Sequence, residues 1–147
     1  MYSDFLNIMI VELSQVKPIS GAVDFIKTIP AGRMAIVTSG AKKISMQSII
    51  SAGIPVPDIM VTSEDISRGK PDPEPYLKAA GILGVQPSEC LVFEDADSGI
   101  QSALAAGMSV IVIGTNSQSL SSNGIVRLDN YEGLNVKFEG YSMILKW

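Results

Sequence analysis

Four short runs of apolar residues constrain the fold of this chain more than any other feature of its sequence. They occupy residues 34–38, 58–63, 90–95 and 109–114, and each is apolar almost throughout rather than at alternate positions. A strand with one face in water alternates apolar and polar residues, whereas a parallel strand covered by helices on both faces does not. The four runs therefore predict parallel strands inside a sheet.

Segments with helical periodicity lie between these runs. In PDPEPYLKAAGILG, the side chains of Tyr76, Ala80 and Leu83 share one helical face, while Asp72 and Pro73 suit the start of a helix. The segment DSGIQSALAAG has a similar apolar stripe. Strands that alternate with helices predict an α/β fold, a Rossmann-like parallel sheet with flanking helices.

The last residues of the chain have a different pattern. The tail NVKFEGYSMILKW carries apolar residues on both sides of Gly140. This pattern predicts a C-terminal β-hairpin.

The composition excludes several classes of function. The chain has 147 residues, no histidine, one cysteine (Cys90) and a net charge of −4. Catalysis by Ser-His-Asp or Cys-His groups and zinc sites with histidine ligands are excluded, and a bound metal would take oxygen ligands, as Mg²⁺ or Ca²⁺ does. There is no basic cluster for nucleic acid or a membrane surface, no segment long enough to span a bilayer, and no signal-peptide pattern. We therefore expect a cytoplasmic protein without nucleic-acid or membrane partners.

Polar residues follow three of the predicted strands or open the helices after them. Thr38, Ser39 and Gly40 end the first run, Lys70 precedes a helix, and Glu94 and Asp95 end the third run. In open parallel sheets, ligands collect at the carboxyl ends of the strands. A hydroxyl and free amides at a helix start bind anions, a lysine balances phosphate charge, and carboxylates hold Mg²⁺. A phosphate ester with its metal ion satisfies all three features together.

Each feature has a simpler interpretation when taken alone. Thr38, Ser39 and Gly40 could serve simply as the start of a helix, with no ligand. Lys70 could be a solvated turn residue, and the two acids could face water at the end of a strand. The occurrence of all three at one sheet edge favours the functional interpretation.

The segments AIVTSG, RGKPDPEPYLKAA and CLVFEDADSGIQSALAAGM resemble the second, third and fourth motifs of the haloacid dehalogenase (HAD) superfamily. More narrowly, they resemble its sugar-phosphatase and β-phosphoglucomutase-like branch. The resemblance implies that Thr38 binds the transferring phosphoryl group with help from the Ser39 amide, and that Lys70 balances its charge. It also implies that Asp95 binds Mg²⁺, with Glu94 as a direct or water-mediated partner.

One further acid, Asp97, lies in the same motif. We expect it to cap the following helix, with Ser98 as the competing cap. A different interpretation makes Asp95 and Asp97 an Asp-x-Asp nucleophile motif, but that motif should precede the hydroxyl and lysine motifs, and here it follows them.

The first motif of the family, Asp-x-Asp-x-Thr, does not occur before Thr38. In the family its first aspartate attacks phosphorus and the second transfers protons. The resemblance therefore implies a chain truncated at its N-terminus, in which residues 1–17 are the remnant of the last cap helix. Residues 18–147 would be a HAD-like core that lacks its first strand and most of the helical cap, with unpaired edges inside the sheet. As an alternative, residues 7–13 could fill that gap as a strand.

These inferences together predict a function. The parent enzyme would be a Mg²⁺-dependent phosphatase that hydrolyses a small sugar or polyol phosphate through an aspartyl-phosphate, and this chain alone is expected to be inactive. The alternatives are a phosphosugar mutase, which shares the three motifs, and a non-catalytic phosphosugar-binding module. The expected partner is a small phosphorylated substrate, and the oligomeric state stays open.

Overall fold

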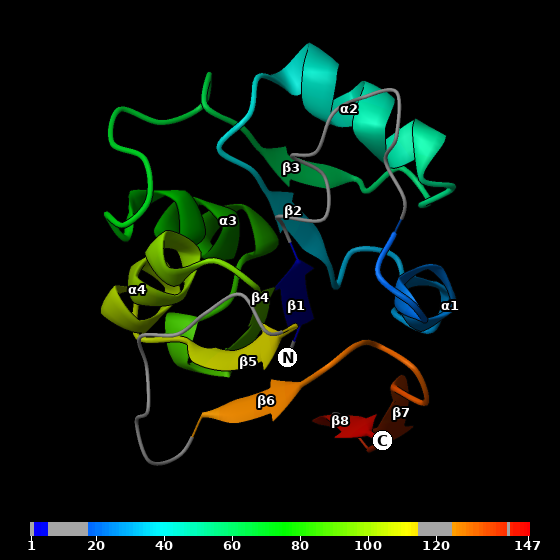
Figure 1. The fold of residues 1–147 in the computed structure, drawn as a ribbon. Coiled ribbons are helices and arrows are strands. Elements are labelled where there is room, and N and C mark those ends of the chain that lie inside the picture. Colours follow the sequence, from blue (N-terminus) through cyan, green and yellow to red (C-terminus); the bar gives the residue numbers. More distant parts are fainter. Residues whose placement is uncertain (1, 6–17, 115–124, 141) are drawn as a thin grey trace.

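A computed structural model describes residues 2–5, 18–114, 125–140 and 142–147 of the chain, with only the backbone described for residues 2–5 (Figure 1). Four helices and eight strands are assigned in these ranges, together with a short 3-10 helix. In chain order they are β1 (Tyr2–Phe5), α1 (Ala22–Lys27), β2 (Ala35–Val37), α2 (Lys42–Ser51), β3 (Ile59–Val61), α3 (Glu74–Leu83), the 3-10 helix (Pro87–Glu89), β4 (Cys90–Glu94), α4 (Asp97–Ala105), β5 (Ser109–Ile113), β6 (Val126–Leu128), β7 (Asn135–Glu139) and β8 (Ser142–Lys146).

The central strands are parallel, as the apolar runs predict. Strands β1, β4, β5 and β6 form one sheet in that order, and β2 pairs with β3 in a second. Strand β1 also contacts β2, so it lies between β2 and β4 (Figure 1). The carboxyl ends of β2, β3 and β4 therefore lie along one side of the molecule.

Helices cover both sides of these strands. Helices α3 and α4 contact each other and lie on one side, where α3 contacts β2 and β3 and α4 contacts β4 and β5 (Figure 1). Helix α1 lies on the other side, where Phe25 packs against Phe93 of β4 and against Tyr131, with ring centroids 5.1 and 5.6 Å apart. Burial on both faces explains why the strands are apolar throughout, and the predicted α/β class is confirmed.

The C-terminal hairpin is also confirmed. Strands β7 and β8 pair antiparallel, with Asn135 opposite Lys146 and Glu139 opposite Ser142. Gly140 lies in the turn with a φ of 63°, a left-handed conformation that glycine adopts without steric cost.

The N-terminal region differs in part from the sequence-based expectation. Within residues 1–17, the described part is β1, an extended strand that pairs with β4 from Tyr2 opposite Cys90 to Phe5 opposite Phe93. A strand therefore lies between β2 and β4; it pairs with β4 and contacts β2, which remains in a separate sheet with β3. Residues 6–17, including most of the predicted cap-helix remnant and the alternative strand at 7–13, lie outside the described residues, so the division at residue 17 stays a prediction. In the described part of the chain, no helix is long and apolar enough to cross a membrane.

Candidate active site

The Lys70 side chain connects the ends of two strands. Its Nζ lies 2.9 Å from Glu94 Oε1, at the end of β4, and donates to the carbonyl oxygen of Val37, the last residue of β2, at 3.4 Å. Strand β1 lies between β2 and β4, so this one ammonium group joins the strand ends on either side of it. The prediction that Lys70 and the acidic motif meet at one sheet edge agrees with this geometry.

The Glu94 carboxylate is enclosed by donors. It is 1% exposed, Oε1 accepts from Lys70 and from the Tyr76 hydroxyl at 3.3 Å, and Oε2 accepts from the backbone N–H groups of Asp95 and Ala96 at 3.0 and 2.9 Å. A buried carboxylate needs such compensation, because its transfer out of water is costly. Glu94 thus holds both Lys70 and the start of α4 in place.

Tyr76 was not singled out as a site residue by sequence reasoning. Its ring lies beneath the Lys70 ammonium, with Nζ 4.9 Å from the ring centroid, while its hydroxyl reaches Glu94. A cation over an aromatic face is stabilised by the ring quadrupole. Tyr76 therefore contacts both members of the ion pair, although the sequence pattern marks it only as a core residue of α3.

Gly99 makes room for Glu94. A Cβ at this position would lie 2.2 Å from Glu94 Cδ and Oε1, which is far inside van der Waals contact for atoms that are not bonded to each other. The absence of a side chain in the first turn of α4 lets the carboxylate lie against the helix start.

The prediction that Asp97, or alternatively Ser98, caps α4 is wrong. The N-cap position is Ala96, without a side-chain hydrogen bond, and Asp97 is the first helical residue. Asp97 and Ser98 lie inside the helix, after the N-cap position, and the Glu94 carboxylate binds the amides of Asp95 and Ala96 just before it.

The hydroxyl motif begins immediately after β2. Thr38 is 1% exposed, its N–H donates to the carbonyl of Val61 at 2.8 Å, and its Oγ1 accepts from the Gly40 N–H at 3.1 Å. Val37, the neighbour of Thr38, carries the carbonyl that binds Lys70. The Lys70 ammonium is thus held at the backbone of the residue before Thr38, while Ser39 is exposed.

Asp95 and Asp97 provide oxygen atoms beside this site. Each places Oδ1 out of contact with solvent, and Asp97 Oδ1 has no hydrogen-bond partner among the described residues. In the described part of the chain, no group of three or more Asp, Glu or Cys residues is close enough to hold a metal. Mg²⁺ commonly takes only one or two carboxylates, with phosphate and water as its other ligands, so a single aspartate is compatible with the predicted ion, and Asp95 as its ligand stays a prediction. Both oxygens of Glu94 are already engaged, which favours a water-mediated role for it.

The loop that carries Lys70 is held by two carboxylates. Asp65 Oδ2 accepts from the N–H and hydroxyl of Thr62, both at 2.8 Å, and Glu74 accepts from the N–H groups of Ser67 and Arg68 at 2.7 and 2.9 Å. These backbone hydrogen bonds favour the ionised forms, so they lower the pKa of Asp65 and of Glu74 below the ordinary values. The loop is thereby braced on both sides of Lys70.

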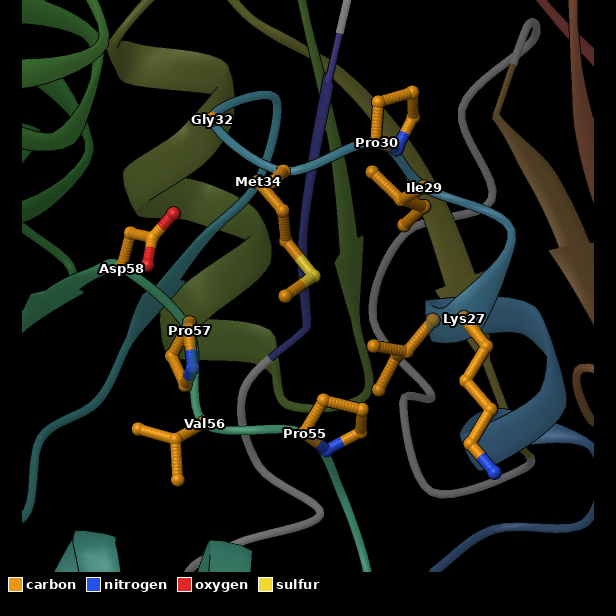
Figure 2. A pocket seen from close by; sticks show the side chains of 11 residues that line it. Lys27, Ile29, Pro30, Gly32, Met34, Pro55, Val56, Pro57 and Asp58 are labelled. Carbon is orange, nitrogen blue, oxygen red and sulfur yellow. The ribbon is translucent and has the colours of Figure 1, made fainter.

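A cavity of about 330 Å³ lies elsewhere in the molecule (Figure 2). Met34, which precedes β2, points into it, and Pro55, Pro57 and Asp58, which precede β3, line another side. This is the amino end of β2 and β3, opposite the edge that carries Thr38 and Lys70. We place the functional site at the carboxyl edge, because the charged and polar groups converge there.

Comparison with known proteins places this geometry in a family. The model of the haloacid dehalogenase-like hydrolase family matches residues 1–113. Hexitol phosphatase A of Escherichia coli (strain K12) is 48% identical over 79 residues, which cover 54% of this chain and 37% of that protein. Fructose-1-phosphate phosphatase YqaB of the same strain is 38% identical over 101 residues, which cover 67% of this chain and 53% of that protein. The chain thus spans about half the length, or less, of these curated relatives.

Solved structures agree with this assignment. The crystal structure of CbbY from Rhodobacter sphaeroides in complex with phosphate superposes with a TM-score of 0.66 and 25% identity, over 80% of this chain and 56% of that chain. The resemblance of the three motifs to the sugar-phosphatase and β-phosphoglucomutase-like branch is confirmed by these relatives. The chain belongs to the haloacid dehalogenase-like hydrolase family.

Proposed function

We propose that this chain carries the phosphate- and metal-binding part of a Mg²⁺-dependent phosphatase that acts on a small sugar or polyol phosphate. The observation that carries the proposal is the position of Lys70, whose ammonium joins the end of β2, next to Thr38, to the acidic end of β4. Two relatives, a hexitol phosphatase and a fructose-1-phosphate phosphatase, support the substrate class.

Each residue has a defined role in this proposal. The Thr38 hydroxyl donates to a phosphoryl oxygen, and Lys70 balances the negative charge that gathers on the phosphoryl group. Asp95 holds the Mg²⁺ ion, which when bound neutralises phosphate oxygens. Glu94 and Tyr76 keep the Lys70 ammonium in position, so that little reorganisation is needed when the ligand binds.

Catalysis also needs a nucleophile. This sequence has no Asp-x-Asp-x-Thr motif, and the one acid in β1 is Asp4. This observation favours a second function for the chain by itself, a phosphosugar-binding module that binds its ligand with Mg²⁺ and does not hydrolyse it.

One experiment tests both functions. The purified chain is titrated with a hexitol phosphate in the presence of Mg²⁺ by calorimetry, and phosphate release is measured on the same sample. The Thr38→Val variant is compared with Lys27→Met, which changes a side chain at the opposite edge of the strands. We expect binding without turnover, weakened by Thr38→Val and unchanged by Lys27→Met. Absence of binding would contradict the proposed site, and phosphate release that Thr38→Val abolishes would contradict the non-catalytic function.

A further inference from the structure

Thr38 has a buried neighbour to which the sequence motifs assign no function. Ser45 lies one turn into α2, is 2% exposed, and its Oγ donates to Thr38 Oγ1 at 3.4 Å. We propose that Ser45 is a positioning residue of the phosphate site, which holds the Thr38 hydroxyl so that its proton points to a phosphoryl oxygen. This inference rests on the proposed phosphate-binding function.

The argument follows from the hydrogen-bonding capacity of a hydroxyl group. A threonine hydroxyl has one proton to donate and two lone pairs that accept. The Gly40 N–H at 3.1 Å donates to one lone pair of Thr38 Oγ1, and the Ser45 hydroxyl lies 3.4 Å from the same oxygen, where it can donate to the other. When both lone pairs are engaged in this way, Thr38 can only donate to a further ligand. Such a group is suited to a phosphate, whose oxygens only accept when it is fully ionised.

The packing around Gly40 leaves little room for a side chain beside the Ser45 hydroxyl. A Cβ at residue 40 would lie 2.8 Å from Ser45 Oγ and 3.4 Å from Thr38 Oγ1. Any larger residue would therefore displace the Ser45 hydroxyl or the turn itself. The glycine of the Thr-Ser-Gly turn thus has a physical role here, which is to let Ser45 reach Thr38.

Ser45 and Ser48 form a matched pair for the test. Both are buried on the inner face of α2, and the Ser48 hydroxyl donates to the carbonyl of Ile44 at 3.1 Å, within its own helix. The two serine-to-alanine changes remove the same atom from the same helix face. Only the Ser45 change removes a contact with Thr38.

The experiment measures the affinity of the full chain for inorganic phosphate in the presence of Mg²⁺. One hydrogen bond is worth roughly 1 kcal/mol, so Ser45→Ala is expected to weaken binding about three- to tenfold, while Ser48→Ala leaves it within about twofold. In a Thr38→Val background, Ser45→Ala is expected to have no further effect, because it acts through Thr38. Ser45→Cys, which replaces the hydroxyl with a slightly larger thiol that is a weak donor, serves as the second variant and is expected to weaken binding too.

Three results would overturn the inference while leaving the phosphate site intact. They are an unchanged affinity in Ser45→Ala, an equal loss in Ser48→Ala, and an equal loss with and without the Thr38 hydroxyl. A wild-type chain that binds no phosphate would instead contradict the proposed function, and the inference would fall with it.

Discussion

Lys70 and Glu94 form a buried ion pair with 2.9 Å between Nζ and Oε1, and their side chains are 3% and 0% exposed. The two residues come from different segments, the loop before α3 and the end of β4. A buried pair contributes little net stability compared with apolar residues, but the loss of one partner leaves the other charge uncompensated. We therefore infer that the pair matters more for fixing the position of the Lys70 ammonium, between the ends of β2 and β4, than for stability.

The first prediction concerns the two halves of this pair. Lys70→Met leaves the Glu94 carboxylate buried without its cation, and we expect the free energy of unfolding to fall by about 3–5 kcal/mol. The double variant Lys70→Met/Glu94→Gln removes both charges and should recover a large part of that loss. Urea denaturation of the wild type, the two single variants and the double variant measures this coupling. A double variant as destabilised as the sum of the single variants would show that the two side chains act independently.

The second prediction concerns the glycine beside Glu94. Gly99→Ala places a Cβ 2.2 Å from the carboxylate, so we expect a loss of unfolding free energy on the order of 1–3 kcal/mol. The matched control is Gly81→Ala within α3, where a new Cβ would meet nothing within 4 Å. That change should raise the stability by about 0.5–1 kcal/mol, since alanine is the better helix former. Equal effects at the two positions in urea denaturation would contradict the close packing of Glu94 on α4.

The third prediction concerns the pH dependence of the loop that carries Lys70. The hydrogen bonds from Thr62 hold the pKa of Asp65 below its ordinary value of 3.8. Between the folded and the unfolded pKa the unfolded state binds more protons, so the contribution of Asp65 is complete above about pH 3.8 and is lost as the pH falls through the folded pKa. We expect the wild type to be more stable than Asp65→Asn at neutral pH. Thermal unfolding of both proteins across the acidic range should show this difference shrinking below that pH, and a difference that grows on acidification would contradict the assignment.

The sequence predicted the parts of the fold that depend on burial. The strands β2, β3, β4 and β5 all lie within the four apolar runs, because only buried parallel strands carry such runs. Strands β1 and β6 were not predicted. Their sequences, Tyr-Ser-Asp-Phe and Val-Arg-Leu, are short and contain polar residues, so their assignment depends on pairing with β4 and β5 and not on their own pattern.

The candidate site was predicted in its charges but not in its supporting contacts. The sequence indicated Thr38, Lys70, Glu94 and Asp95, because each residue follows a strand or precedes a helix at the same edge. The partners that hold these residues cannot be inferred from spacing along the chain. The Tyr76 hydroxyl contacts a carboxylate 18 residues away, and Ser45 has the pattern of an ordinary helical serine.

The central claim, that one edge of the sheet binds phosphate and Mg²⁺ together, is tested most directly by measuring how Mg²⁺ changes the affinity for inorganic phosphate. The purified chain is titrated with phosphate with and without Mg²⁺, alongside Asp95→Asn and the control Asp58→Asn, an aspartate at the opposite edge. We predict that Mg²⁺ tightens phosphate binding about tenfold or more in the wild type and in Asp58→Asn, and that Asp95→Asn abolishes this effect while keeping metal-free binding. Equal affinity with and without Mg²⁺ in the wild type, or an undiminished Mg²⁺ effect in Asp95→Asn, would contradict the account.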